Sequence, residues 1–252
     1  MSADHSRRNR YPEVDAFRGV AISMMILFHL VFDLSFFSIY PVEVQSGSWK
    51  VFGYTTAVLF VLVAGIAVAL KSEKLPYGAG SRDWYLSFLT RGLFLIGIGY
   101  AITVVTYIVL NGEGFVIFGI LHLIGASTII AAFFVRLPHS SLLMGIIIIL
   151  IGFSLPLPQG PIWFSFIGIH PADFYSVDYT PLIPWFGVFL IGVEIGSWLY
   201  PGGIRRFSMS DRALQKMVLP ACIGRHSLII YLLHQPVLIA LLYLISGKTF
   251  VL

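Results

Sequence analysis

Hydrophobic residues along the chain gather into long runs that are separated by short polar connections. The runs cover residues 16–39, 53–70, 86–110, 116–135, 140–155, 180–199 and 218–245. Each is near the ~20 residues that a helix needs to cross a bilayer, and the fifth is the shortest. The pattern predicts an all-α fold, a polytopic transmembrane helical bundle of about seven spans.

Composition supports the same class of protein. Of 252 residues, 58% are hydrophobic and 11% are charged, whereas soluble domains carry about 25% charged residues. We expect one membrane domain over 14–246, between a polar tail (1–13) and a short tail (247–252). The single cysteine, Cys222, excludes an intrachain disulfide framework, and no zinc-ligand spacing occurs, so we expect no metal.

Positive charges report the orientation of the predicted spans. Most Lys and Arg residues fall on the N-terminus and on the even-numbered connections, while the odd-numbered connections and the C-terminus hold only Lys50 and Lys248. Cytoplasmic segments carry the excess of positive charge, so the N-terminus is predicted inside and the C-terminus outside. The same distribution argues against nucleic acid as a partner, because the cations do not cover one soluble face.

Four ionisable residues lie in or beside the first run, on one side of the predicted helix. Asp15, Arg18, His29 and Asp33 fall within an arc of about 60° on a helix, and His29 lies about 20 Å beyond Asp15. Ionisable groups inside a span are costly and usually functional, so we predict that His29 is a base oriented by Asp33 at i+4. Asp15 and Arg18 also fit an interfacial pair, and Asp33 also fits a group that reaches the far headgroups.

Cationic residues gather toward the predicted cytoplasmic side. They are Arg18, Arg91, Arg225 and His226. Arginine suits phosphate because its planar fork donates in pairs and stays charged. The alternative is a set of topology-determining charges together with an Arg91–Glu194 pair.

A second polar set lies toward the middle or the outside of the membrane. Its members are His29, Asp33, His122, Asp178, Tyr179 and His234. Such a set can supply a base, its orienting group and donors for an oxyanion, although a structural hydrogen bond explains His122 equally well. The separation of the two sets suits a cytoplasmic anionic donor whose reactive end reaches mid-membrane, as in a nucleotide thioester. Gly192 and Gly196 indicate close helix packing.

Four motifs carry a resemblance to a known family. They are VDAFRGVAISMMILFHLVFDL, FGILHLIG, VDYTPLIPWFGVFLIG and IGRHSLIIYLLHQP, between Val14 and Pro236. Together they resemble the heparan-α-glucosaminide N-acetyltransferase catalytic domain, in its small prokaryotic branch. The resemblance implies transfer of an acetyl group from cytoplasmic acetyl-coenzyme A to a sugar amine or hydroxyl, with a histidine as base or acyl carrier.

The chain departs from that family at one place. In the lysosomal relatives the active histidine lies in the loop after the first helix, whereas IYPVEVQSGSW here contains no histidine. His29, which matches the intrahelical histidine of the broader sugar O-acyltransferases, is our substitute for it. We expect catalysis by His29 with Asp33, assisted by His122 or His234; direct transfer and an acyl-histidine intermediate both remain open.

The remaining assignments concern ligands and location. The coenzyme A phosphates are expected at Arg18, Arg91, Arg225 and His226, and the acceptor, a carbohydrate or glycolipid, at Asp178, Tyr179 and Trp185. The expected location is the cytoplasmic membrane of a prokaryote, with the lipid bilayer as surroundings, and a homodimer is compatible with the sequence. Two other functions fit the same residues: a proton-coupled transporter of a small polar solute, and a non-enzymatic membrane scaffold.

Overall fold

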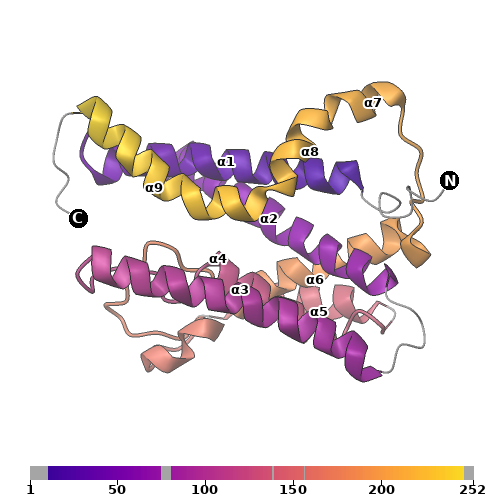
Figure 1. Ribbon diagram of the computed structural model, residues 1–252. Helices are drawn as coiled ribbons and strands as arrows, with labels where there is room; N and C mark the ends of the chain where they lie inside the picture. The colour runs from indigo at the N-terminus through magenta and orange to yellow at the C-terminus, as the bar shows by residue number, and fades with distance from the viewer. Residues whose placement is uncertain (1–10, 75–80, 138, 156, 247–252) are drawn as a thin grey trace. The chain divides into compact units, whose positions relative to one another are not determined.

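The computed structural model describes residues 11–74, 81–137, 139–155 and 157–246, which fold mostly into helices (Figure 1). Within those ranges there is no strand, and Phe118 and Tyr179 form an isolated bridge. The helices are α1 (Pro12–Phe36), α2 (Gly47–Lys74), α3 (Ser81–Val109), α4 (Ile120–Ala131), α5 (Ser140–Ser154), η1 (Ile162–Ile167), α6 (Leu182–Leu199), η2 (Pro201–Gly203), α7 (Asp211–Lys216), α8 (Val218–Arg225) and α9 (Ser227–Ser246).

The prediction of an all-α polytopic bundle is confirmed. Five of these helices, α1, α2, α3, α6 and α9, are long and apolar enough to cross a membrane. The fourth and fifth predicted spans correspond to the shorter apolar helices α4 and α5, and the seventh is divided at His226 into α8 and α9. The orientation of the termini stays a prediction, and the tails at 1–10 and 247–252 lie outside the described residues.

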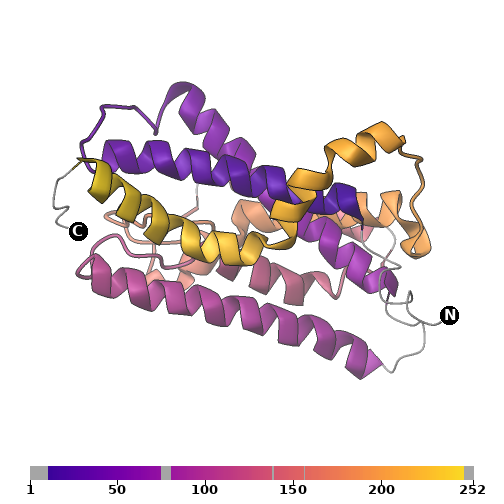
Figure 2. The same ribbon diagram turned by 45° about the horizontal axis from the view of Figure 1, so that its top comes forward.

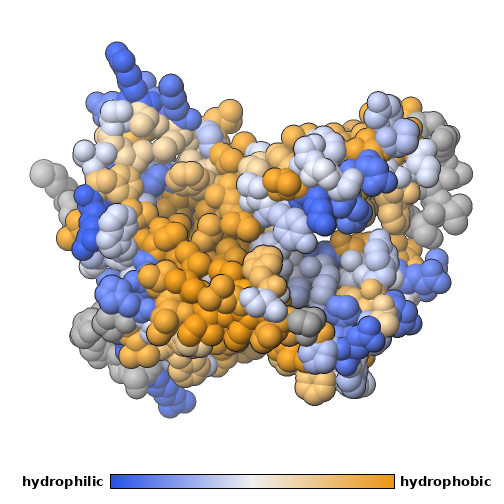
Figure 3. Space-filling model, turned by 180° about the vertical axis from the view of Figure 1, so that it is seen from behind, coloured by the Kyte–Doolittle hydropathy of each residue, from blue (hydrophilic) through white to orange (hydrophobic). Residues whose placement is uncertain are grey.

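Large apolar side chains are exposed on many of the helices, as the broad orange area in Figure 3 shows. Examples are Val105 and Ile108 of α3, Leu150 of α5, and Leu244 of α9. A water-soluble protein rarely exposes apolar area of this extent, whereas a helix that faces lipid does so at no cost. The surface is therefore that of a protein embedded in a bilayer.

The described residues divide into two compact units. The first unit contains the residues up to 63 and those from 208 onward, and the second contains residues 64–207. Helix α2 begins in the first unit and ends in the second. The prediction of one domain over 14–246 stays a prediction.

In the first unit, α1 packs against α8 and α9, as Figures 1 and 2 both show. Two glycines make the α1–α8 contact close: a β-carbon on Gly19 would lie 1.9 Å from the carbonyl oxygen of Pro220, and one on Gly224 would lie 1.8 Å from that of Asp15. Neither distance is compatible with van der Waals contact. The two helix backbones therefore touch directly, and this contact fixes how α8 lies along α1.

In the second unit, α3 packs against α4, and α6 packs against α5 and α4. Glycines again allow close approach, since a β-carbon on Gly92 would lie 2.6 Å from the Gly125 carbonyl oxygen. A β-carbon on Gly196 would lie 2.7 Å from the β-carbon of Ala69 in α2. The interpretation of Gly196 as a packing residue is confirmed.

The connection that precedes α6 is tied to the segment before α4. The Thr180 backbone N–H donates to the Phe118 carbonyl at 2.9 Å, next to the Phe118–Tyr179 bridge. The Tyr179 hydroxyl donates to the Ser165 carbonyl at 2.7 Å, so it also holds η1.

The Gly19 contact yields a first prediction. Gly19→Ala should destabilise the protein by about 2 kcal/mol, because the added methyl group meets a helix backbone that must move. For a chain of this size that corresponds to a fall in Tm of about 4–8 °C, measured on the purified protein in detergent. Gly97→Ala is the matched control, since a β-carbon there meets nothing within 4 Å. An equal fall in both variants would contradict the proposed helix contact.

Tyr179 yields a second prediction. Burial raises the pKa of Tyr179 to about 12, above its usual value near 10. The folded state then holds the phenol proton more tightly than the unfolded state, so stability is full below pH 10 and declines as the pH rises toward 12. In Tyr179→Phe, the loss of Tm between pH 9 and pH 11 should be smaller than in the wild type. Tyr175→Phe, a change at an exposed tyrosine, is the control.

Candidate functional site

Two histidine rings meet in the first unit. His29 of α1 and His234 of α9 have ring centroids 4.9 Å apart, and His29 also contacts Phe28 and Phe32 at 5.9 and 6.4 Å. Both histidines were predicted as catalytic candidates, and the packing of α9 on α1 brings them together. The site is therefore a pair of imidazoles in an aromatic environment.

The hydrogen bond that His234 makes fixes its tautomer. Its Nδ1 faces the carbonyl oxygen of Tyr231, which can only accept, so Nδ1 carries the proton. In the neutral ring Nε2 then holds a lone pair, and this buried atom has no hydrogen-bond partner among the described residues. His234 is thus prepared to act as a base.

Asp33 contacts Gln235 and not the histidine that it was predicted to orient. The Gln235 Nε2 amide group donates to Asp33 Oδ1 at 2.7 Å, and Asp33 is only 2% exposed. No hydrogen bond joins Asp33 to His29 in the described part of the chain. The i+4 spacing on α1 is outweighed here by an amide that α9 supplies from the side.

Gln235 is a site residue that the sequence prediction missed. The available signal was an amide side chain within an apolar span, directly after His234 in the motif YLLHQP. An amide in that position must find a polar partner or lie unsatisfied in hydrocarbon. Only the packing of α9 on α1 identifies that partner as Asp33.

The three unpaired polar atoms of this cluster are all acceptors. They are Asp33 Oδ2, Gln235 Oε1 and His234 Nε2, and each is buried without a hydrogen-bond partner among the described residues. Unsatisfied buried polar atoms are unfavourable, so such a group suits a ligand that donates hydrogen bonds. Amines and hydroxyls are ligands of that kind. We call Asp33, Gln235, His29 and His234 the acceptor cluster, because its unpaired atoms accept hydrogen bonds.

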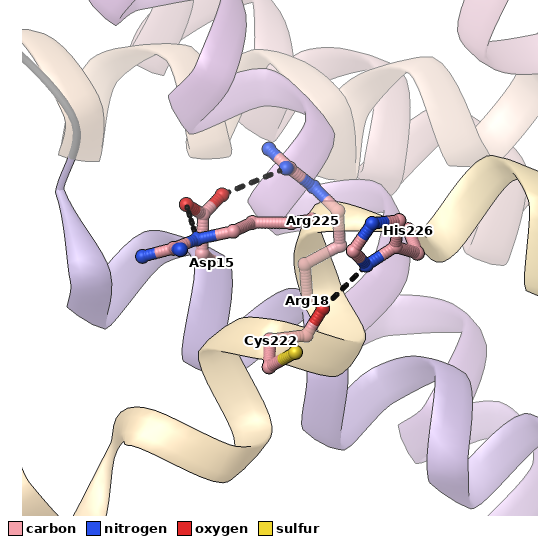
Figure 4. A network of polar contacts seen from close by, with 5 residues as sticks. All are labelled: Asp15, Arg18, Cys222, Arg225 and His226. Carbon is pink, nitrogen blue, oxygen red and sulfur yellow. Dashed lines mark hydrogen bonds and ion pairs between the residues drawn. The ribbon is translucent and has the colours of Figure 1, made fainter. Parts of the chain in front are cut away.

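A cationic group lies at the start of α1 (Figure 4). Asp15 binds Arg18 at 3.1 Å and the Nε of Arg225 at 3.7 Å, and His226 Nδ1 lies 3.0 Å from the Cys222 carbonyl oxygen. The Asp15–Arg18 pair considered as an alternative is thus formed. Asp15 of this pair also contacts Arg225. Arg225 and His226 are exposed, so both can reach a ligand.

The cationic group and the acceptor cluster share α1. Arg18 and His29 are eleven positions apart, which is about 16 Å along a helix. Both groups face partners on the α8–α9 side of α1, since Arg225 and His234 contact them. The arrangement can hold an anionic group at one level and a reacting group at another.

The other predicted site residues lie in the second unit. Arg91 is exposed on α3, with its guanidinium 5.7 Å from the Phe94 ring centroid, and Trp185 is half-buried in the first turn of α6. The suggested Arg91–Glu194 pair is wrong, because Glu194 binds His139 Nδ1 at 3.2 Å. The roles predicted for Arg91 and Trp185 stay predictions.

His122 and Asp178 organise the start of α4. His122 Nδ1 accepts the Gly119 backbone N–H at 3.3 Å, and Asp178 Oδ2 accepts that of Ile120 at 3.2 Å. The His122 ring, 2% exposed, packs against Tyr100 and Phe118. The structural hydrogen bond considered for His122 is present, and catalytic or acceptor-binding roles for these two residues stay predictions.

Comparison with known proteins identifies the family. The family model described as "Heparan-alpha-glucosaminide N-acetyltransferase, catalytic" matches residues 10–236, which include α1 and the start of α9. No curated protein and no solved structure matches the chain at a significant level. Among the described residues, no three histidine, cysteine, aspartate or glutamate side chains are grouped so that they could hold a metal ion. With the match covering most of its length and five helices able to span a membrane, the chain belongs to the heparan-alpha-glucosaminide N-acetyltransferase catalytic family of membrane acetyltransferases.

Proposed function

We propose that this protein transfers an acetyl group from cytoplasmic acetyl-coenzyme A to an amine or hydroxyl of a carbohydrate or glycolipid. The observation that carries the proposal is the contact of His29 with His234 beside the Asp33–Gln235 pair. The family supplies the class of reaction, and the acceptor cluster supplies the groups that such a reaction needs. The proposed site lies wholly in the first unit.

Donor binding is assigned to the cationic group. Arg18, Arg225 and His226 would hold the phosphates of coenzyme A, because arginine forks match phosphate oxygens. Asp15 would keep the two guanidinium groups in place, since it contacts both. The thin arm of the donor would then run along α1 toward His29. In this way the arm would bring the thioester next to the imidazoles.

The acceptor is assigned to the unpaired atoms of the cluster. Asp33 Oδ2 and Gln235 Oε1 would accept hydrogen bonds from the amine or hydroxyls, which replaces the partners that these buried atoms lack. The acceptor atom would then lie near the Nε2 lone pair of His234. Geometry of this kind contributes by holding the reacting groups in position.

The chemical step is an acyl substitution. The acceptor nitrogen or oxygen forms a bond to the carbonyl carbon of the thioester, and the carbon–sulfur bond breaks. The acceptor proton passes to Nε2 of His234 and then to the departing thiolate, so the products are coenzyme A thiol and the acetylated acceptor. The His29 ring against His234 positions that base, or carries the acyl group in a two-step route.

Substitution of the two histidines tests the proposal. His29→Gln and His234→Gln should each lower kcat by about 10²–10⁴-fold, with little change in KM for acetyl-coenzyme A, because they remove the base and leave the donor site. The measurement is release of coenzyme A thiol by the purified full chain with glucosamine as acceptor. His139→Gln, at an exposed histidine, is the control. Unchanged kcat in both variants would overturn the mechanism, and solute flux without thioester consumption would favour a transporter.

The cationic group gives a separate prediction. Arg18→Gln and Arg225→Gln should each raise KM for acetyl-coenzyme A about tenfold or more, since a hydrogen bond between charged groups is worth about 1.5–3 kcal/mol. The effect on kcat should be smaller, because these residues lie far from the imidazoles. Arg212→Gln, at an exposed arginine of α7, controls for loss of positive charge. A KM increase of the same size in this control would show that only net charge matters.

A further inference from the structure

One face of α3 in the second unit gathers positive charge and aromatic rings. Trp84, Ser87, Phe88 and Arg91 follow one another at helical spacing and lie on the same side of the helix. The Lys71 ammonium of α2 donates to the Ser87 carbonyl and lies 4.7 Å from the Phe88 ring centroid. Helices α2 and α3 thus meet at a lysine pressed against this face.

A third cation reaches the same face from the segment after α4. The Arg136 guanidinium carbon lies 3.9 Å from the Trp84 ring centroid, and the rings of Trp84 and Phe88 are 4.7 Å apart. Arg91 lies three residues beyond Phe88, on the same side of α3. We call Lys71, Trp84, Arg91 and Arg136 the donor cluster, because their side chains donate hydrogen bonds; the name does not refer to the acetyl donor.

The polar side-chain groups of the donor cluster are all hydrogen-bond donors. Lys71 has three N–H groups and uses one on Ser87, and the two arginines offer five each. The indole N–H of Trp84, a side chain only 5% exposed, is buried with no hydrogen-bond partner among the described residues. No carboxylate is paired with Lys71, Arg91 or Arg136 in the described part of the chain.

Like charges held close together destabilise each other. The aromatic rings offset part of this through cation–π contacts, but they provide no acceptor for the free N–H groups. An anion with several oxygens would satisfy both needs, because it neutralises the cations and accepts from lysine, arginine and indole together. Groups of basic residues between membrane helices suit phosphate headgroups.

We propose that the donor cluster binds the phosphate group of an anionic ligand. Phosphate fits better than a carboxylate, because its oxygens point in several directions and can meet cations that come from α2, α3 and the segment after α4. Such a phosphate is carried by anionic phospholipids and by soluble nucleotides such as coenzyme A. The site belongs to the second unit, and its residues are not those to which the proposed donor and acceptor binding is assigned.

The test uses the purified full chain in a neutral detergent. Its Tm is measured with added phosphatidylglycerol, with phosphatidylcholine as the uncharged-lipid comparison, and with coenzyme A. At roughly a hundredfold excess over Kd, phosphatidylglycerol should raise Tm by about 5–10 °C. Lys71→Met/Arg136→Gln should lose at least half of that shift. Arg206→Gln is the matched control, because Arg206 also lies over a tryptophan, at 5.8 Å from the Trp198 ring centroid.

The outcomes separate the sources of phosphate. A phosphatidylglycerol shift that the double variant loses and the control keeps identifies a lipid phosphate. If coenzyme A raises the Tm of the wild type but not of the double variant, and phosphatidylglycerol raises neither, the ligand is a nucleotide phosphate. The proposal is overturned if the double variant keeps the full phosphatidylglycerol shift and the full coenzyme A shift of the wild type. If the double variant does not fold, Arg91→Gln decides, because Arg91 is exposed and its loss leaves Trp84 packed; an unchanged shift there would also overturn it.

Discussion

The direct contact between the backbones of α1 and α8 is the constraint on which the first unit depends. Gly19 and Gly224 leave no room for a β-carbon, so α8 can lie against α1 in only one register. That register places Arg225 next to Asp15. Because only His226 separates α8 from α9, it also carries α9 back along α1 and sets His234 and Gln235 against His29 and Asp33.

The acceptor cluster and the donor cluster contain polar groups of opposite hydrogen-bonding character. The acceptor cluster of the first unit leaves a carboxylate oxygen, an amide oxygen and an imidazole nitrogen unpaired, while the donor cluster of the second unit leaves an indole N–H unpaired beside three cations. Neither set can satisfy itself. Unsatisfied groups of this kind are costly in a protein surrounded by hydrocarbon, which is the reason for proposing a ligand at each cluster. The acceptor cluster therefore suits a ligand that donates hydrogen bonds, and the donor cluster suits a ligand that accepts them.

Much of this architecture could be predicted from the sequence, because periodicity and charge act along a single helix. The polar stripe along the first span indicates the Asp15–Arg18 pair and a site at His29, because these residues all lie on one helix. Contacts between helices could not be predicted in the same way. The i+4 spacing on α1 predicts that Asp33 orients His29, but Asp33 instead accepts a hydrogen bond from Gln235 of α9. Glu194 likewise binds His139, an exposed residue on the connection before α5, instead of an arginine at a similar predicted depth.

The start of α4 depends on a residue that comes much later in the chain. Asp178 accepts the Ile120 backbone N–H, and α4 itself has only 12 residues, about 18 Å of helix, against a hydrocarbon core of about 30 Å. While the ribosome is still synthesising the intervening segment, this N–H has no carboxylate to bind and must remain hydrated. The hydrogen bonds at the start of α4 are therefore complete only once the segment that leads into α6 is in place.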